Sequence, residues 1–460
     1  MKHNYDVIVV GAGPAGMSAA VEADTHGLSV CVLDEQLSAG GQIYRNVENA
    51  KQHQQKILGA DYLFGKTLVE ALKQSSAVHR KGVTVWKVGK DGSVAFSQSG
   101  HAEQIRGKHV ILANGAMERP VPLPGWTLPG VLTAGAAQIM MKTSSIAARD
   151  AVIIGSGPLL YLVAVQMVAA GMPPKALIET QSYRDFMKAL PYFGKALRNC
   201  KPLFKGVRML MTLKLAGVQR FKGATNISIN GKGKAEAVHF KVGSKAYQIQ
   251  ASHVFLHQGV VPNTQISRSL NLEHKYHSLQ HCFHPVIDEF GQSSHPLFSI
   301  AGDGSGIGGA KAAELSGKIC ALNAAFSIKK IRKDVRDKSA LKLNKQLRVE
   351  LSIRPFLDAL YPPPQSVLLP ANDTIICRCE EVTAGEIRHY ASLGCKGPNQ
   401  TKSFGRSGMG PCQGRFCGLA VTEILAKEIG TSQDAIGSYR IRAPLKAVTL
   451  KELADLGVQE

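Results

Sequence analysis

The sequence has few acidic residues, little tryptophan and no long apolar run. Its 460 residues include 34 Asp and Glu against 55 Lys and Arg, which gives a net charge of +21, and only two Trp. No stretch of about 18 uninterrupted apolar residues occurs, so we expect no membrane-spanning helix. The N-terminal MKHNYDVIVVGAGPAGMSAA is too punctuated by glycine for a signal peptide. These features predict a cytoplasmic globular protein, and its length predicts two to four domains.

The excess of basic residues is concentrated in two segments. Residues 184–222 contain ten Lys or Arg and one acid, and residues 329–348 contain nine against two. A basic surface can face nucleic acid, anionic lipid, an acidic partner protein or simply water. The chain has no nucleic-acid-binding module and no basic motif interleaved with aromatic residues, so we expect no nucleic-acid partner. A solvated face, peripheral contact with the cytoplasmic face of the inner membrane and contact with a partner protein stay open.

An N-terminal glycine motif predicts a dinucleotide site. The segment YDVIVVGAGPAGMSAA reads as an apolar strand, a turn with Gly11, Gly13 and Gly16, and a helix of small residues. Such glycines allow a tight turn, close approach of a pyrophosphate, and close packing of helix on strand. The phosphate then lies at the helix N-terminus. A second strand, LSVCVLDE, ends with Glu35, 24 residues after Gly11, where it can accept hydrogen bonds from ribose hydroxyls.

Three further segments resemble the flavoproteins with two dinucleotide-binding domains, which include thioredoxin and glutathione reductases. These segments are GGQ at 40–42, VILANGAMERPVPLPG at 110–125, where Asn114 replaces the usual Thr, and LFSIAGDGSG at 297–306. The resemblance implies bound FAD, with Asp303 at its ribityl or pyrophosphate part. The residues assigned to FAD are Gly11, Gly13, Pro14, Ala15, Gly16, Asp34, Glu35, Gly41, Gln42, Ala113, Asn114, Gly115, Gly302 and Asp303.

The redox cysteine pair that disulfide reductases of that family carry is missing. GGQIYR contains no cysteine, nor does the stretch 118–199, and Cys31 alternates within a strand, where we expect it in the core. Disulfide reduction is therefore not expected. No Ser/His/Asp or Cys/His constellation typical of a catalytic site is visible either, so the catalytic residues stay unassigned.

A second segment repeats the opening pattern in altered form. AVIIGSGPLLYLVAVQMVAAG carries Gly155 and Gly157, and Glu179 ends KALIE 24 residues after the first of these glycines. The repeat predicts a second Rossmann unit inserted into the first. Leu160 stands at the third glycine position, where it should push the helix off the strand or crowd the phosphate site. NAD(P), another adenylate bound differently, and a purely structural unit all stay open.

A histidine-rich segment, HKYHSLQHCFH, offers His274, His277, His281, Cys282 and His284 in a spacing that could hold zinc. It lies where we expect a surface loop or a strand pair, and it lacks a second ligand pair at finger-like separation. We therefore interpret these residues as solvent-exposed histidines without a metal.

Five of the nine cysteines fall within the last 90 residues. Cys377 and Cys379 form C-x-C in TIICRCEEVTAGEI, and Cys412 and Cys417 form C-x4-C in MGPCQGRFCG. Four thiolates can hold zinc or an iron–sulfur cluster, although structural zinc usually uses C-x2-C hooks, and reduced free thiols are the third reading. Arg378, Lys402, Arg406 and Arg415 lie near in sequence and could offset a cluster's negative charge, which leaves Cys395 as a spectator. Thr383 and Glu386 form a capping box that predicts a helix over AGEIRHYASLG, ended by Gly394.

The last segment resembles the bacterioferritin-associated-ferredoxin-like [2Fe-2S] domain. The whole chain, including the tail YRIRAPLKAVTLKEL, resembles the alpha subunits of heteromeric dye-linked dehydrogenases: D-hydroxyproline and proline dehydrogenases, opine oxidases and hydrogen cyanide synthase. The resemblance implies FAD and a [2Fe-2S] cluster in one subunit. It also implies a glycine-oxidase-like FAD subunit that oxidises an amino or imino acid, a small ferredoxin-like subunit, and a quinone-type acceptor. A self-contained NAD(P)H oxidoreductase and a non-enzymatic flavoprotein that serves an iron carrier are the alternatives.

We therefore predict an α/β fold of two nested dinucleotide-binding domains followed by a small [2Fe-2S] domain. The predicted ranges are 1–148 and 251–328 for the FAD domain, 149–250 for the inserted Rossmann-like domain, 329–370 for a basic helical linker, 371–445 for the [2Fe-2S] domain and 446–460 for the tail.

Overall fold

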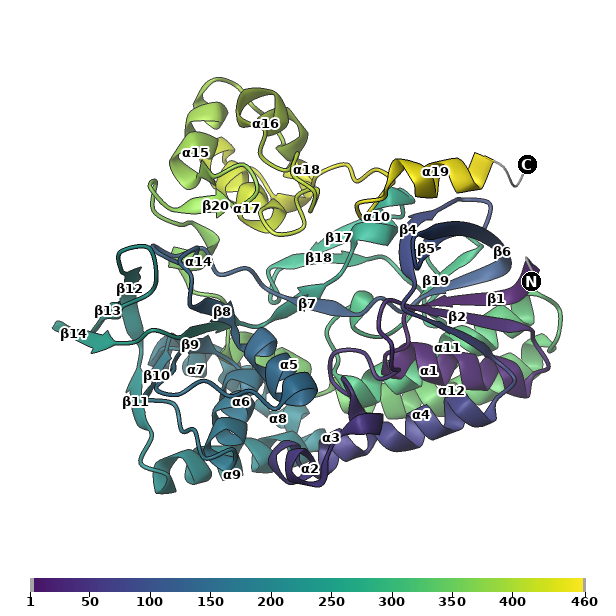
Figure 1. Cartoon of the computed structure of the whole chain (residues 1–460), viewed down its shortest axis with the longest axis horizontal. Coiled ribbons are helices and arrows are strands. Elements are labelled where there is room, and N and C mark those ends of the chain that lie inside the picture. The colour runs from purple at the N-terminus through teal and green to yellow at the C-terminus, as the bar shows by residue number, and fades with distance from the viewer. Residues whose placement is uncertain (1–3, 458–460) are drawn as a thin grey trace.

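Two α/β units lie side by side, and a small cysteine-bearing unit sits above them (Figure 1). The computed structural model describes residues 4–457. The chain leaves the cysteine unit through an extended segment and ends in a helix that lies over the first α/β unit (Figure 1). The predicted α/β architecture with Rossmann-like sheets is confirmed.

The first sheet contains seven strands in the order β3-β2-β1-β6-β5-β4. Strands β1, β2 and β3 run parallel, β4 and β5 return antiparallel, and β19 pairs in parallel with the second half of β6. Apolar residues of β1 and β6 face both ways and are almost fully buried, as expected for a sheet covered on both faces. The strands are β1 (Asn4–Val10), β2 (Val30–Asp34), β3 (Val78–Lys81), β4 (Thr84–Val88), β5 (Ser93–Gln98), β6 (His101–Leu112) and β19 (Phe298–Ile300).

Helices cover one face of this sheet. The glycine-rich start of the first helix lets it pack against the last helix of the unit, because a Cβ on Gly317 would lie 2.1 Å from the Ala15 carbonyl oxygen. The helices and 3-10 turns of this unit are α1 (Pro14–Thr25), η1 (Val47–Asn49), α2 (Gln52–Leu58), α3 (Ala60–Leu63), α4 (Gly65–Gln74), η4 (Gly302–Gly304), α11 (Ala310–Ser327) and α12 (Lys333–Leu351).

The second α/β unit holds a five-stranded parallel sheet in the order β11-β10-β9-β15-β8. Two of its strands lie outside residues 149–250. The strands are β8 (Val131–Thr133), β9 (Val152–Ser156), β10 (Ala176–Glu179), β11 (Gln219–Lys222) and β15 (Val254–Gln258). An antiparallel sheet adjoins it, made of β12 (Ala224–Asn230), β13 (Ala237–Val242) and β14 (Lys245–Gln250). The helices are α5 (Ala134–Ser144), α6 (Pro158–Ala169), α7 (Tyr183–Ala189), η2 (Leu190–Tyr192), α8 (Phe193–Ala196), η3 (Leu197–Asn199) and α9 (Lys201–Leu215).

Short elements connect the units. Strands β7 (Ala116–Glu118) and β16 (Val260–Pro262) pair where the chain crosses between the two sheets, and β17 (His274–His277) pairs with β18 (Cys282–Pro285) after helix α10 (Gln265–Ser269). The linker continues through α13 (Arg354–Leu360), whose apolar side packs on α7 and α8, and α14 (Gln365–Leu368).

The cysteine unit is a small helical cluster around a two-stranded ribbon. Its elements are β20 (Ile375–Cys377), β21 (Val382–Thr383), α15 (Ala384–Ser392), α16 (Pro398–Gly405), α17 (Gly418–Ile429) and α18 (Gln433–Ile436). The predicted capping box is present, since the Thr383 hydroxyl accepts from the Glu386 N–H and Glu386 accepts from the Thr383 N–H. Helix α19 (Leu450–Gly457) closes the described chain. Across residues 4–457, no helix combines the length and the apolarity that a membrane crossing requires.

Candidate functional site

The first glycine motif forms a tight turn between β1 and α1. Gly11 has φ +106°, and a Cβ there would lie 2.5 Å from the Ala113 carbonyl oxygen. A Cβ on Gly16 would lie only 1.8 Å from the Gly11 carbonyl oxygen, so this glycine lets helix and strand touch. Gly13 faces Gly41, whose own Cβ would come within 2.8 Å of the Gly13 Cα. The GGQ segment therefore lies directly against the glycine turn, which leaves the backbone bare for a pyrophosphate.

The two acids that end β2 have different surroundings. Asp34 is 7% exposed and accepts hydrogen bonds from the N–H groups of Ala12 and Gln36, so it fixes the glycine turn from behind. Burial raises its pKa. Glu35 is exposed, as a ribose acceptor requires, but its carboxylate pairs with Lys446 Nζ at 3.1 Å. Lys446 comes from the tail, and nothing in its local sequence announces this contact.

A buried lysine holds the GGQ segment from the second unit. Lys142 on α5 is 3% exposed, and its Nζ donates to the carbonyl oxygens of Gln42 (3.0 Å) and Ile43 (2.9 Å) and to Gln138 Oε1 (2.9 Å). Burial lowers the pKa of Lys142 to about 7. Three acceptors match the three protons of an ammonium group, which favours the charged form. The two α/β units are thus joined at the segment assigned to FAD.

The two remaining FAD motifs meet the glycine turn at the carboxyl ends of parallel strands. The Ala113 N–H donates to the Val10 carbonyl oxygen, which places the 113–115 segment beside the end of β1. Gly302 lies so close to α1 that a Cβ there would come within 2.8 Å of the Ala15 Cβ. Asp303 follows, and its Oδ1 accepts from the N–H groups of Gly308 and Gly309, ahead of α11. The residues therefore fit an extended dinucleotide such as FAD, whose binding part the glycines would cradle.

In the second unit, the chain itself occupies the position assigned to a ribose. Glu179 is fully buried and forms a two-pronged ion pair with Arg220, with Nε to Oε1 at 2.5 Å and Nη2 to Oε2 at 2.9 Å. The Tyr161 hydroxyl and Gln181 Nε2 also donate to Glu179. Tyr361 of the linker packs edge-on against Tyr161, with ring centroids 6.3 Å apart. A ribose would have to displace this network.

The glycine turn of the second unit is equally filled. A Cβ on Gly155 would meet the His257 carbonyl oxygen, and the His257 ring lies within 4 Å of the Cβ position of Gly157. His257 in turn pairs with Glu118 through Nδ1 at 2.7 Å. Leu160, which we expected to push the helix off the strand, lies fully buried in the core between α6 and the sheet. A nucleotide at this turn stays a prediction.

The four predicted cysteine ligands come together as two pairs. Cys377 at the end of β20 and Cys417 before α17 are each 1% exposed and share a hydrogen bond between their sulfurs. Cys379 and Cys412 lie nearer the surface, with their Sγ atoms 3.8 Å apart. The Cys417 thiol, together with nearby backbone N–H groups, lowers the pKa of Cys377 to about 5. Cys395 lies in the core of the unit and donates to the Gly397 carbonyl oxygen.

Two thiol pairs supply the four sulfurs that a [2Fe-2S] cluster takes, two for each iron. The loops around them are tight. A Cβ on Gly410 would lie 2.2 Å from the Cys379 Cβ, and one on Gly414 2.2 Å from the Tyr439 ring. Within residues 4–457, no three or more His, Cys, Asp or Glu side chains are arranged to hold a single metal ion. The cluster therefore stays a proposal, supported by the paired thiols and the narrow loops.

The basic residues near these cysteines have different partners. Arg406 pairs with Glu380 at 2.8 Å. The Arg378 guanidinium lies over the Trp126 ring at 5.1 Å, and Lys402 lies over the Tyr439 ring at the same distance. Arg415 has a buried Nε without a hydrogen-bond partner among the described residues. Within residues 4–457, an acid thus neutralises Arg406 alone of the four predicted counter-charges, which leaves positive charge beside the thiol pairs.

The histidine-rich segment differs from our expectation. It forms the predicted strand pair, β17 and β18, but its histidines are half-buried rather than exposed. His277 and His284 stack with ring centroids 4.7 Å apart, and His274 Nε2 lies 2.9 Å from the Ser267 hydroxyl. Burial lowers the pKa of His274 to about 3 and that of His284 to about 4. The prediction of exposure was wrong because the cysteine unit and α10 cover this ribbon.

Comparison with known proteins places both parts of the chain. Residues 5–317 match the family described as pyridine nucleotide-disulphide oxidoreductase, and residues 372–456 match the sarcosine oxidase A3 domain. An opine oxidase subunit of Rhizobium meliloti is 42% identical over 466 residues, which cover 99% of this chain and 88% of that protein. Hydrogen cyanide synthase subunit HcnB of Pseudomonas aeruginosa is 30% identical, with 99% and 100% covered.

A solved structure shows the same fold over nearly the whole length. The L-proline dehydrogenase of P. horikoshii matches 98% of this chain and 80% of its own, with a TM-score of 0.68 and 18% identity. The family match covers more than half of the chain, and the relatives extend it to full length. The chain therefore belongs to the pyridine nucleotide-disulphide oxidoreductase family of flavin-dependent oxidoreductases, together with hydrogen cyanide synthase subunit HcnB and the opine oxidase subunit.

Proposed function

We propose that this chain is the electron-transferring subunit of a heteromeric dehydrogenase that oxidises the C–N bond of an amino or imino acid. The observation that carries the proposal is the presence, in one chain, of a dinucleotide cradle and two cysteine pairs. FAD would lie on the glycine turn, with Glu35 at its ribose and Asp303 near its ribityl chain. A [2Fe-2S] cluster would be held by Cys377, Cys379, Cys412 and Cys417.

Each cofactor would supply a different redox step. Oxidation of an amine to an imine releases two electrons and two protons, and a flavin takes electrons in pairs whereas a [2Fe-2S] cluster carries them singly. This chain contributes the binding surfaces and their charges. The relatives are named as subunits, so we propose a hetero-oligomer in which a glycine-oxidase-like flavoprotein oxidises the substrate. A quinone-type acceptor and a small ferredoxin-like subunit would complete the chain of carriers.

Substitution of one outer cysteine tests the ligand assignment. Cys412→Ser should remove the cluster, because a serine hydroxyl is a poor iron ligand, while the flavin stays bound. Cys395→Ser is the matched control, since Cys395 lies in the same unit and donates to a backbone carbonyl. Iron, acid-labile sulfide and flavin are measured on the purified proteins. A full complement of iron in Cys412→Ser would refute the assignment.

An anaerobic titration with NADH separates this proposal from a self-contained NAD(P)H oxidoreductase. The pairing of Glu179 with Arg220 favours a chain that receives its electrons from a partner. We therefore expect the visible absorption of the purified chain to persist with NADH and to bleach with dithionite. Prompt bleaching by NADH would show that the second unit works as a nucleotide site and would overturn the proposed electron source.

An exposed apolar face suits the partner protein. Along α7 to α9, Tyr183, Phe204, Met211 and Leu215 are between 62% and 89% exposed, and the last three recur at helical spacing on α9. Basic residues surround them. A contiguous apolar face rimmed by charge is typical of a protein interface. We propose that the substrate-oxidising subunit covers it.

The double substitution Phe204→Ser and Leu215→Ser tests this interface. It should reduce co-purification of the co-expressed partner, whereas Leu341→Ser, which removes an equally exposed leucine from α12, should not. Flotation with anionic vesicles distinguishes the membrane reading. If the wild-type chain floats and the double variant does not, while partner recovery is unchanged, the face contacts lipid and the proposed interface is wrong.

A further inference from the structure

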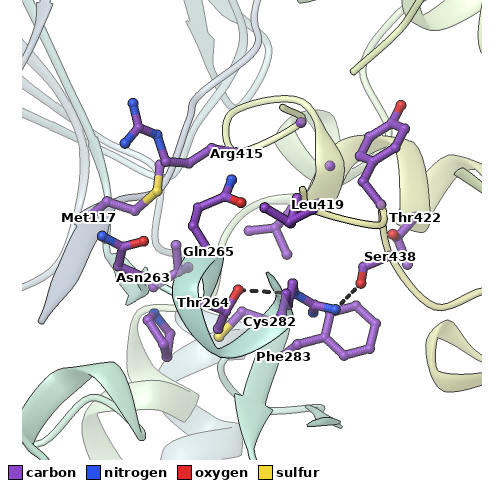
Figure 2. A pocket seen from close by; sticks show the side chains of 17 residues that line it. Met117, Asn263, Thr264, Gln265, Cys282, Phe283, Arg415, Leu419, Thr422 and Ser438 are labelled. Atoms are coloured by element: carbon purple, nitrogen blue, oxygen red, sulfur yellow. Dashed lines mark hydrogen bonds between the residues drawn. The ribbon is translucent and has the colours of Figure 1, made fainter. Parts of the chain in front are cut away.

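A pocket lies at the seam between the first α/β unit and the cysteine unit (Figure 2). The body contributes the 261–268 segment and β18, and the cysteine unit contributes the 414–419 loop and residues 438–441. The space open to water corresponds to about 60 Å³, which suits roughly five water molecules or one ligand of similar size. No FAD residue and none of the four predicted cysteine ligands lines it.

Arg268 on α10 brings a positive charge to this pocket without an acid to balance it. Its Nε donates to Thr264 Oγ1 at 3.0 Å, its Nη1 donates to the Ser438 hydroxyl, and its guanidinium lies 4.7 Å above the Phe283 ring. Both hydrogen bonds are drawn in Figure 2. Within residues 4–457 no carboxylate pairs with it. A buried cation normally has an anionic partner, because its desolvation is otherwise uncompensated.

Further polar atoms on the pocket wall have no hydrogen-bond partner within the described part of the chain. They are Arg415 Nε, Asn263 Oδ1 and Gln265 Oε1, all of them buried. Figure 2 shows Asn263 and Gln265 on the body side and Arg415 on the loop of the cysteine unit. Each unmet group costs about 1–3 kcal/mol. A ligand that is anionic toward the arginines and offers a proton to the amide oxygens would satisfy all of them.

We propose that this pocket binds one small oxyanion, a phosphate or a carboxylate group, on Arg268 and Arg415. Monohydrogen phosphate and a free amino acid both combine an oxyanion with a proton donor. The ligand would join the two units across their seam, since Arg268 belongs to the body and Arg415 to the cysteine unit. The site depends only on residues of this chain, so it stands whether or not the proposed function holds.

Calorimetric titration of the full-length protein tests the site. Sodium phosphate, sodium acetate and glycine are each added at a constant ionic strength maintained with sodium chloride. We expect saturable binding of one equivalent of phosphate or of a carboxylate compound. Phosphate alone would identify a phosphate group as the ligand, whereas glycine or acetate alone would identify a carboxylate. Absence of saturable binding for all three would overturn the proposal.

Substitution distinguishes a ligand site from a counter-charge. Arg268→Gln should weaken the anion roughly tenfold or more, as expected for loss of a charged hydrogen bond. Arg440→Gln, which removes an exposed arginine of the cysteine unit, should leave the affinity unchanged. Should Arg268→Gln fail to fold, Arg415→Gln tests the opposite wall. Unchanged anion affinity in both variants, with a shifted midpoint potential, would show that the arginines serve the cysteine centre instead.

Discussion

At the residue scale, the glycines of the first motif divide into structural and ligand-facing positions. Gly16 lies against the Gly11 carbonyl oxygen, whereas a Cβ on Gly13 would meet only the Gly41 Cα, at 3.8 Å. Gly13 also has φ −75°, which any residue adopts. Its place in the motif therefore concerns the approach of the ligand rather than the folding of the chain.

Gly13→Val should leave a folded protein that lacks flavin, because the side chain projects where the pyrophosphate must approach the backbone. Gly206→Val makes the same change on α9, where nothing lies within 4 Å, and should keep its flavin. Circular dichroism and the ratio of flavin to protein absorbance check both variants. Stoichiometric flavin in Gly13→Val would show that the motif has been misinterpreted.

A buried histidine makes stability depend on pH. His109 on β6 is 1% exposed, and burial lowers its pKa from 6.5 to about 4. The unfolded chain therefore binds a proton between these values that the folded chain does not, so stability is complete above pH 6.5 and is lost as the pH falls toward 4. At about 1.4 kcal/mol per pKa unit, His109 contributes about 2 kcal/mol to the loss between about pH 7 and pH 5.

His109→Gln should accordingly lose about 2 kcal/mol less than the wild type between about pH 7 and pH 5, as measured by urea unfolding. The substitution of an exposed histidine on α15, His389→Gln, is the control. Parallel pH profiles of wild type and His109→Gln would mean that other groups cause the acid sensitivity.

At the element scale, local patterns located the helix and strand starts correctly. The capping box at Thr383 predicted the start of α15, and the two glycine motifs predicted the β1–α1 and β9–α6 turns. Each is a short-range pattern that the backbone reads within one turn. Partners distant in sequence stayed hidden, because Lys446 meets Glu35 across 411 residues and Arg220 meets Glu179 across 41. The exposure assigned to His274 failed for the same reason.

Thr383→Ala should destabilise the cysteine unit by about 1 kcal/mol, the usual loss for an N-cap side chain. The hydroxyl accepts from the Glu386 N–H, and alanine leaves that donor unmet. Thr431→Ala, at an exposed position of the same unit, should be close to neutral. Urea unfolding followed by circular dichroism gives both values, and equal stabilities would argue against the capping box.

At the scale of the whole molecule, the tail binds back to the first unit. The Leu445 N–H donates to the Trp86 carbonyl oxygen at 2.7 Å, and Val448 and Leu456 pack against the Trp86 side chain. Trp86 is 3% exposed under this cover. The other tryptophan, Trp126, donates from Nε1 to the Ile375 carbonyl oxygen at 2.7 Å, where the cysteine unit begins. The cysteine unit is thus tied to the body at both ends.

Removal of residues 446–460 should expose Trp86 and leave Trp126 covered. Loss of the Val448 and Leu456 contacts should cost about 3 kcal/mol, given the usual value of a buried aliphatic side chain. We expect a red shift of the Trp86 emission and stronger quenching by acrylamide, read in a Trp126→Phe background. An unchanged emission spectrum would show that α19 does not cover Trp86 in solution.

This attachment also fixes an order of events during synthesis. The ribosome completes the β4–β5–β6 meander long before it makes the tail that covers Trp86. The apolar edge is therefore bare on every nascent chain until the last segment emerges, which is the period when uncovered apolar surface invites aggregation. Ribosome-bound chains arrested before residue 446 should accordingly recruit a chaperone at this edge, and the released protein should not.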